Sequence, residues 1–162
     1  MAIKTAPPKP RVLFVCLGNA VRSQMAEALA RHSASDVATY ASAGLTPLGA
    51  IAPLTHRVLA ERGVNSAGHY SKSLEQASHT RADIVINMSG EPRGSHFREC
   101  KAEIEDWRVD DPYGMEIEEY RRACDAIEVR LAEFTARMRA RTAAAYARPG
   151  GRKEAGTRNV KN

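Results

Sequence analysis

Short apolar segments alternate with amphipathic ones along this chain. Brief runs of Val, Ile, Leu and Phe are typical of strands that are buried on both faces of a sheet. On this pattern, strands are expected at 12–15, 37–41, 84–88 and 104–109. Helices are expected at 24–32, 53–62 and 92–100, with Pro53 as a favourable first helical residue and Gly63 as a stop signal.

The most regular pattern begins at Met115. Apolar residues recur from there at alternating spacings of three and four: Ile117, Tyr120, Cys124, Ile127, Leu131, Phe134 and Met138. The opposite positions are charged, so the pattern predicts one long helix with an apolar face toward the core and a solvated back. Cys124 lies on the apolar face and is therefore predicted to be a packing residue.

Strands that alternate with helices predict an α/β fold, in which a parallel sheet is covered on both faces. Ligands of such sheets bind beyond the carboxyl ends of the strands. Cys16, Ser42 and Met88 stand at the ends of three predicted strands, and the residues after the fourth strand meet them at the same edge. A functional site is expected there.

The net charge of +5 comes from the two ends of the chain. The polar segments 1–10 and 148–162 carry the basic excess and leave the body, 11–147, with one more acidic than basic residue. We therefore predict one catalytic domain at 11–147 between disordered tails, and no nucleic acid as a partner. Weak binding of a polyanion by the basic C-terminal tail is the alternative.

Cysteine content and hydropathy bear on the cellular setting. Cys16, Cys100 and Cys124 are too few and too scattered for a disulfide scaffold or a zinc site. The longest apolar run, 12–17, is far too short to span a membrane, and the proline-rich start does not fit a secretory signal. These features predict a cytoplasmic protein without a metal site or a membrane contact.

The chemistry is concentrated between the first strand and the first helix, in Cys16-Leu17-Gly18-Asn19-Ala20-Val21-Arg22-Ser23. A loop in this position directs its backbone N–H groups and the helix N-terminus at an anion, and an arginine adds a full charge. Because such surroundings favour a thiolate, Cys16 is predicted to be a nucleophile that faces a tetrahedral oxyanion. The alternative is a cysteine buried in the core. Gly18 and Asn19 argue against it, since both tolerate the left-handed backbone of a tight anion-binding loop.

Asp110-Asp111-Pro112-Tyr113 supplies a second reactive group, just before the long helix. Attack of a thiolate on phosphorus requires a proton for the leaving oxygen, and hydrolysis of the cysteinyl phosphate requires a base for the incoming water. Proline holds its predecessor in an extended conformation, so Asp111 is predicted to be directed by a fixed backbone. An Asp-Pro pair is also common as a simple turn.

The Cys16–Ser23 motif, Met25-Ala26-Glu27 and Asp111-Pro112-Tyr113 together resemble the low-molecular-weight protein tyrosine phosphatase family, over about residues 11–140. The thiol-coupled arsenate reductases are a sister branch with the same fold. The resemblance implies a three-layer α/β sandwich of the phosphotyrosine phosphatase I type, with a four-stranded parallel sheet between helices. It also implies a phosphoenzyme mechanism that uses no metal or cofactor.

The same resemblance assigns the reaction to three side chains. It implies Cys16 as the nucleophile, Arg22 as the bidentate clamp on the phosphoryl oxygens, and Asp111 as the general acid and then the base. The substrate-binding residues that it implies are Leu17, Gly18, Asn19, Ala20 and Val21, through their backbone N–H groups, together with Ser23 and Tyr113.

Several of these residues would support the reaction indirectly, again as the resemblance implies. Ser23 would form a hydrogen bond with the sulfur of Cys16 and help it to leave. Asn19 would hold the strained shape of the loop, with Ser42 and His69 as its supporting partners.

Four positions bear on the choice between the two branches. Val21 replaces the second cysteine of most phosphatases, and Gln24 stands where reductases usually have glutamine and phosphatases proline. Ser89 occupies the place of the first relay cysteine of thioredoxin-coupled reductases, and Cys100 lies beyond the expected place of the second. A complete relay of thiols is therefore absent.

The residues expected at the substrate walls disagree as well. Tyr113 favours a substrate with a phenyl ring, whereas Leu48 replaces the aromatic residue of the opposite wall in eukaryotic enzymes. The predicted function is a phosphatase acting on phosphotyrosine proteins or small aryl phosphates, with inorganic phosphate and similar oxyanions as ligands. An arsenate reductase that uses an external small thiol is the alternative, and a non-catalytic anion-binding module is a third possibility.

Overall fold

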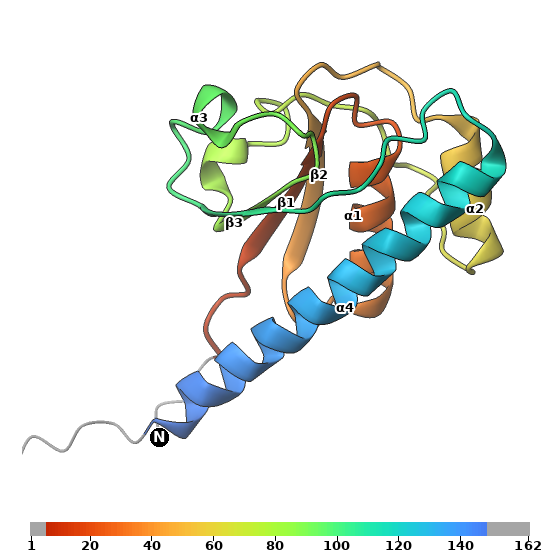
Figure 1. Cartoon of the computed structure of the whole chain (residues 1–162). Helices are drawn as coiled ribbons and strands as arrows, with labels where there is room; N and C mark the ends of the chain where they lie inside the picture. The colour runs from red at the N-terminus through yellow and green to blue at the C-terminus, as the bar shows by residue number, and fades with distance from the viewer. Residues whose placement is uncertain (1–5, 149–162) are drawn as a thin grey trace, which may run out of the picture.

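The computed structural model describes residues 6–148 and contains one four-stranded sheet (Figure 1). Its strands are β1 (Arg11–Cys16), β2 (Thr39–Gly44), β3 (Ile84–Asn87) and β4 (Glu103–Asp106). They lie in the order β2-β1-β3-β4 and all pair in parallel, which confirms the predicted α/β class. Because β1 is central, its last residue, Cys16, lies beside the ends of both β2 and β3.

Helices cover the two faces of the sheet unequally. The helices are α1 (Arg22–Ser33), α2 (Pro53–Glu61), α3 (Arg93–His96) and α4 (Ile117–Ala147), with a 3₁₀ turn, η1, at His79–Arg81. The three longer helices contact one another on one face, while α3 lies on the other (Figure 1). Alternate side chains of β1 pack on opposite faces of the sheet. Val12 and Phe14 belong to the larger core cluster, and Leu13 and Val15 belong to the smaller one.

The long C-terminal helix has the predicted apolar face. Its buried side chains are Tyr120, Ala123, Cys124, Ile127, Leu131, Phe134 and Thr135. Burial raises the pKa of the Cys124 thiol to about 12, so this cysteine packs in the core as an uncharged group.

Most predicted bounds differ from the structure by one or two residues, and three elements differ more. β2 begins and ends later than 37–41, because it pairs with β1 along the whole of Arg11–Cys16 and reaches Gly44. The fourth strand ends at Asp106 rather than 109, since β3 offers no partner beyond Asn87. The third helix is only Arg93–His96, because the chain then buries Phe97 in the smaller core cluster.

Most of the two predicted tails lies outside the part of the chain that the structure describes. Residues 6–10 form neither helix nor strand, and the segments 1–5 and 149–162 are not described. Within 6–148, no helix is long and apolar enough to cross a bilayer, and no group of three or more His, Cys, Asp and Glu side chains is arranged to hold a metal.

Gly44 brings the end of β2 against the loop that follows β1. A Cβ atom at this position would lie 2.8 Å from the backbone nitrogen of Asn19 and 2.9 Å from both the Gly18 carbonyl carbon and the Leu17 carbonyl oxygen. These are backbone atoms, which cannot rotate away as a flexible side chain could. The absence of a side chain at Gly44 is therefore needed for the loop to pack as it does.

We expect Gly44→Ala to displace the loop and to lower the free energy of unfolding by about 1–3 kcal/mol, the usual cost of overpacking. Urea unfolding measures this change. Gly94→Ala is the matched control, because nothing lies within 4 Å of a Cβ atom there; it should change the free energy by less than about 1 kcal/mol. Equal stability of the wild type and Gly44→Ala would contradict the packing argument.

Candidate active site

The segment between β1 and α1 forms a loop whose carbonyl groups point away from its centre. The Leu17 carbonyl accepts a hydrogen bond from Thr46 N at 2.8 Å, and the Gly18 carbonyl accepts one from Leu48 N at 3.0 Å. The Ala20 carbonyl accepts from Ala52 N at 3.1 Å and from the Thr55 hydroxyl at 2.9 Å. In a trans peptide the next N–H points the opposite way, so these bonds turn N–H groups of the loop toward its centre.

Local backbone geometry completes this inward arrangement. Asn19 adopts the left-handed conformation with φ +47°, one of two such residues other than glycine among residues 6–148. Helix α1 then begins at Arg22, and its N-cap residue, Val21, makes no side-chain capping bond. The first N–H groups of α1 therefore receive no hydrogen bond from a capping side chain and can donate to an anion bound in the loop.

Cys16 lies at the base of this loop, next to a hydroxyl group. Its sulfur is 2.9 Å from the Ser23 hydroxyl oxygen. That oxygen also accepts a bond of 2.8 Å from the Asn19 side-chain amide. Since the amide nitrogen can only donate, the hydroxyl proton of Ser23 is free to point at the sulfur.

Arg22 is buried and anchored to the ends of two strands. Its Nη1 donates to the carbonyls of Met88, at 2.7 Å, and Val109, at 3.2 Å, while its Nη2 lies 3.0 Å from the Asp111 carboxylate. Within 6–148, its Nε is the one buried side-chain nitrogen or oxygen with no hydrogen-bond partner. A buried N–H without a partner is costly, so this donor is expected to meet a ligand.

Asp111 stands half-exposed beside Arg22. One of its carboxylate oxygens accepts from Tyr113 N at 3.2 Å, and the other pairs with Arg22. Asp111, which precedes Pro112, thus contacts Arg22 at the start of α1. This carboxylate therefore lies beside the donors that would hold an anion.

A pocket of about 270 Å³ opens above Cys16. Its lining residues are Cys16, Leu17, Gly18, Ala20, Val21, Arg22, Thr46, Leu48, Asp111 and Tyr113. Arg22 and Asp111 are its only charged lining residues in the described chain, and the exposed side chains of Leu17, Leu48 and Tyr113 stand at its apolar walls. The pocket combines a polar base with an apolar entrance.

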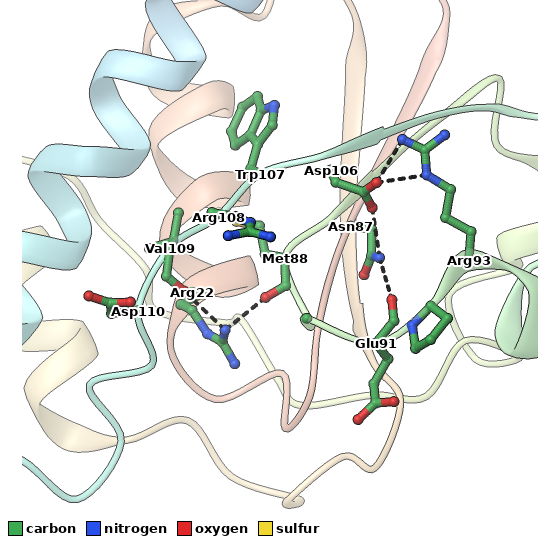
Figure 2. A pocket seen from close by; sticks show the side chains of 12 residues that line it. Arg22, Asn87, Met88, Glu91, Arg93, Asp106, Trp107, Arg108, Val109 and Asp110 are labelled. Carbon is green, nitrogen blue, oxygen red and sulfur yellow. Dashed lines mark hydrogen bonds and ion pairs between the residues drawn. The ribbon is translucent and has the colours of Figure 1, made fainter.

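A larger hollow of about 700 Å³ lies on another side of Arg22 (Figure 2). It runs between the segment after β3 and the segment after β4, where Arg93 pairs with Asp106 at 2.7 Å and Asn87 donates to the same carboxylate group. In Figure 2 a dashed line joins Arg22 to Met88, and both residues line this hollow. Cys16 does not line this hollow, so the predicted nucleophile belongs to the smaller pocket.

His69, expected as a supporting partner of Asn19, has another residue between itself and Asn19 in the structure. Ser42 does contact the Asn19 amide, at 3.0 Å. The Nδ1 atom of His69 instead lies 3.2 Å from Gln24 Oε1 and 3.0 Å from the Glu27 carboxylate. Gln24 occupies the space between, since its Nε2 donates to Asn19 Oδ1 at 2.9 Å. His69 therefore contacts the loop indirectly, through the side chain of Gln24.

Glu27 and Lys72 are charged, buried and absent from the sequence-based site. Burial disfavours the Glu27 carboxylate, but the His69 hydrogen bond and the charges of Lys72 and Arg31 outweigh it and hold its pKa below the ordinary value. Burial lowers the pKa of the Lys72 ammonium, against the opposing charge of Glu27. Glu27 could have been suspected from the sequence, because it is the one charged residue in the apolar stretch 25–30 and belongs to the Met25-Ala26-Glu27 motif. Lys72 carries no such signal, because it lies in a polar loop.

The thiol of Cys100 does not line the pocket above Cys16. Cys100 packs against the smaller core cluster, and its sulfur donates to the His79 carbonyl at 3.6 Å. Burial, with a smaller contribution from Glu99, raises its pKa. Ser89 hydrogen-bonds the Asn87 side chain at 2.6 Å. Neither position offers a reactive thiol for a relay to Cys16.

Comparisons with known proteins agree with this fold. The chain is 30% identical over 142 residues to "Probable low molecular weight protein-tyrosine-phosphatase EpsP" of Ralstonia nicotianae, covering 80% of this chain and 96% of that protein. Its structure is similar to the YwlE arginine phosphatase from Geobacillus stearothermophilus, with a TM-score of 0.74, 28% identity and coverage of 88% and 99% of the two chains. It is also similar to an arsenate reductase in the phosphate binding state, with a TM-score of 0.71, 27% identity and coverage of 80% and 98%.

The family model named "Low molecular weight phosphotyrosine protein phosphatase" matches residues 11–144, nearly the whole of the predicted domain. The chain therefore belongs to the low molecular weight phosphotyrosine protein phosphatase family, which agrees with the resemblance carried by its motifs.

Proposed function

We propose that this chain is a phosphatase that hydrolyses phosphotyrosine or small aryl phosphate monoesters through a cysteinyl-phosphate intermediate. The observation that supports this most is the buried, unpartnered Nε of Arg22 beside Cys16. Together with the inward N–H groups of the loop, it forms a set of donors for the equatorial oxygens of a phosphoryl group. The similar arsenate reductase in a phosphate binding state supports an oxyanion as the ligand.

In the first step the Cys16 thiolate attacks phosphorus. The S–P bond forms as the P–O bond to the leaving group breaks, and protonated Asp111 gives its proton to the leaving oxygen. The phosphoryl group accepts hydrogen bonds from Nη2 and Nε of Arg22. Because Nη2 then binds the substrate, Asp111 loses its ion pair with the guanidinium. In the second step Asp111 accepts a proton from water as the water oxygen attacks phosphorus. The S–P bond breaks, and the Ser23 hydroxyl stabilises the departing thiolate.

The entrance of the pocket supports an aryl leaving group. Tyr113 and Leu48 offer an aromatic and an aliphatic surface, on which a substrate ring packs better than a charged group. The mechanism uses no metal or cofactor. Because a thiolate nucleophile needs a reducing compartment, we place the enzyme in the cytoplasm, with 11–147 as its catalytic unit.

Arsenate reduction with an external small thiol is the second candidate, and the similarity to an arsenate reductase favours it. Arsenate would add to Cys16 with loss of water. An external thiol would then attack the Cys16 sulfur, releasing arsenite and leaving a mixed disulfide, and a second thiol would release the external disulfide. Two thiols supply the two electrons, so Cys100 is not needed.

A paired assay decides between these activities. The wild-type protein is expected to hydrolyse aryl phosphates, and Cys16→Ser is expected to abolish turnover while still binding inorganic phosphate. Cys100→Ser, the matched control, should leave the rate unchanged. Arsenate-dependent oxidation of glutathione without hydrolysis would reject the phosphatase in favour of the reductase. Phosphate binding without either activity would identify an anion-binding module.

Replacement of the arginine tests the donor set. Arg22→Lys keeps the charge but loses the planar pair of donors, so kcat/KM for an aryl phosphate should fall by about 10²–10³-fold. Arg130→Lys, on the exposed side of α4, is the control and should be silent. A lysine variant as active as the wild type would show that Arg22 does not hold the transferred group.

Asp111→Asn tests the acid. We expect it to slow hydrolysis by about 10²–10⁴-fold for a poorly acidic phenol and much less for a strongly acidic one, which needs no protonation to leave. Asp110→Asn is the neighbouring control, since Asp110 does not line the pocket above Cys16. The measurement is kcat/KM across a series of substituted phenyl phosphates. A uniform loss across the series would speak against proton donation by Asp111.

A further inference from the structure

Lys72 is a lysine in an unusual place. It lies in the loop between α2 and β3, its residue is only 7% exposed, and lysine is seldom buried to this extent. Its ammonium is held by two neutral oxygens, the Tyr70 carbonyl at 3.1 Å and the Ser42 hydroxyl at 3.4 Å. The same ammonium lies 4.7 Å above the centre of the Tyr70 ring. A buried charge has a desolvation cost, which its contacts must offset.

The contacts of Lys72 reach both ends of the Asn19 amide. Its backbone N–H donates to Asn19 Oδ1 at 2.9 Å, and Gln24 donates to the same oxygen. The other end, Asn19 Nδ2, donates to the Ser42 hydroxyl, which also accepts from the Lys72 ammonium. Two donors at Oδ1 leave no choice of amide orientation, so Nδ2 must face Ser42 and Ser23.

This orientation gives one direction to the hydrogen bonds that lead from Asn19 to the sulfur of Cys16. Asn19 donates to the Ser23 oxygen, and the Ser23 proton then points at the sulfur of Cys16. Asn19 and Ser23 thus present their positive ends toward the sulfur, while the Ser42 oxygen, which accepts from both the Lys72 ammonium and Asn19, holds the amide in this orientation. Buried hydrogen bonds that follow one another, as those from Asn19 through Ser23 to Cys16 do, strengthen one another and favour negative charge on the sulfur.

We propose that Lys72 is a positioning residue for the nucleophile: its ammonium, through Ser42 and Asn19, aligns the Ser23 hydroxyl and stabilises the thiolate of Cys16. The proposal deepens the proposed phosphatase function, which rests on the same sulfur. It adds a residue that does not line the pocket and does not touch the substrate.

Other charged groups face the two ends of this network and are unchanged by substitution of Lys72. Glu27 and Arg31 of α1 act on the ammonium, and the Tyr70 ring lies beneath it. Arg22 and Asp111 line the pocket above the sulfur. An effect of Lys72 must therefore appear as a difference between variants in which all of these groups remain.

Lys72→Met, which keeps most of the length of the side chain and removes its charge, is the central test. The rate of alkylation of Cys16 by iodoacetamide is followed against pH by peptide mass spectrometry, which separates Cys16 from the other thiols. The midpoint of this profile should move to higher pH, and kcat/KM for an aryl phosphate should fall about tenfold. Lys72→Arg should restore part of both effects. Lys101→Met, an exposed control, should show neither.

Ser42→Ala provides an independent test, because it cuts the network and keeps the lysine. It should shift the alkylation profile in the same direction even if Lys72→Met fails to fold. In the double variant the two shifts should not add, since both substitutions break the same connection. Wild-type alkylation in folded Lys72→Met, no shift in Ser42→Ala, or additive shifts would each overturn the proposal.

The alkylation profile does not require turnover. Failure of the enzyme to hydrolyse any aryl phosphate would remove the proposed function and leave the effect of Lys72 on Cys16 measurable. Conversely, if the enzyme is active and the alkylation profile of Cys16 is the same in Lys72→Met as in the wild type, only the positioning role of Lys72 is rejected.

Discussion

The outward rotation of the loop carbonyls is the constraint on which the rest of the site depends. Segment 46–55 donates hydrogen bonds to the carbonyls of Leu17, Gly18 and Ala20, and the trans peptide geometry then turns N–H groups inward. The fold allows this because β1 is central, so that its loop emerges beside Gly44 at the end of β2. A backbone with its donors converging on one point has few uses other than holding an anion.

Arg22 joins this loop to the other half of the sheet. Its guanidinium spans the carbonyls after β3 and β4 and still leaves one edge for a ligand. The strand order places both segments within reach, since β3 lies next to β1 and β4 next to β3. The same side chain also separates the small pocket from the larger hollow, so any change of the segments that flank the hollow bears on the donor set.

The parts of the structure that the sequence predicted are those set by local pattern. The apolar spacing from Ile117 to Phe134 has one physical solution, a helix with one buried face, and the motif from Cys16 to Ser23 has a required backbone. The predicted bounds were less accurate for elements that depend on a partner. β2 extends to Gly44 because it pairs with β1 as far as Cys16, and α3 is short because Phe97 is buried in the smaller core cluster.

In the site, too, residues within a local motif were predicted from the sequence, and residues placed by contacts between distant segments were not. Residues within the motif, and Asp111 held by its proline, were predictable one by one. The positions of His69, Gln24 and Lys72 depend on contacts between distant segments, which no spacing along the chain reveals. They decide how the Asn19 amide is oriented, and therefore which way the hydrogen bonds to the sulfur run.

In the mechanism that we propose, Cys16 carries the phosphoryl group during turnover. Rapid acid quenching of Asp111→Ala after mixing with an aryl phosphate, followed by mass spectrometry of the intact protein and its peptides, measures this directly. We predict one phosphoryl group per chain, attached to Cys16, that forms as quickly as the first equivalent of phenol is released. Release of phenol with no phosphorylated cysteine at any time would contradict the mechanism.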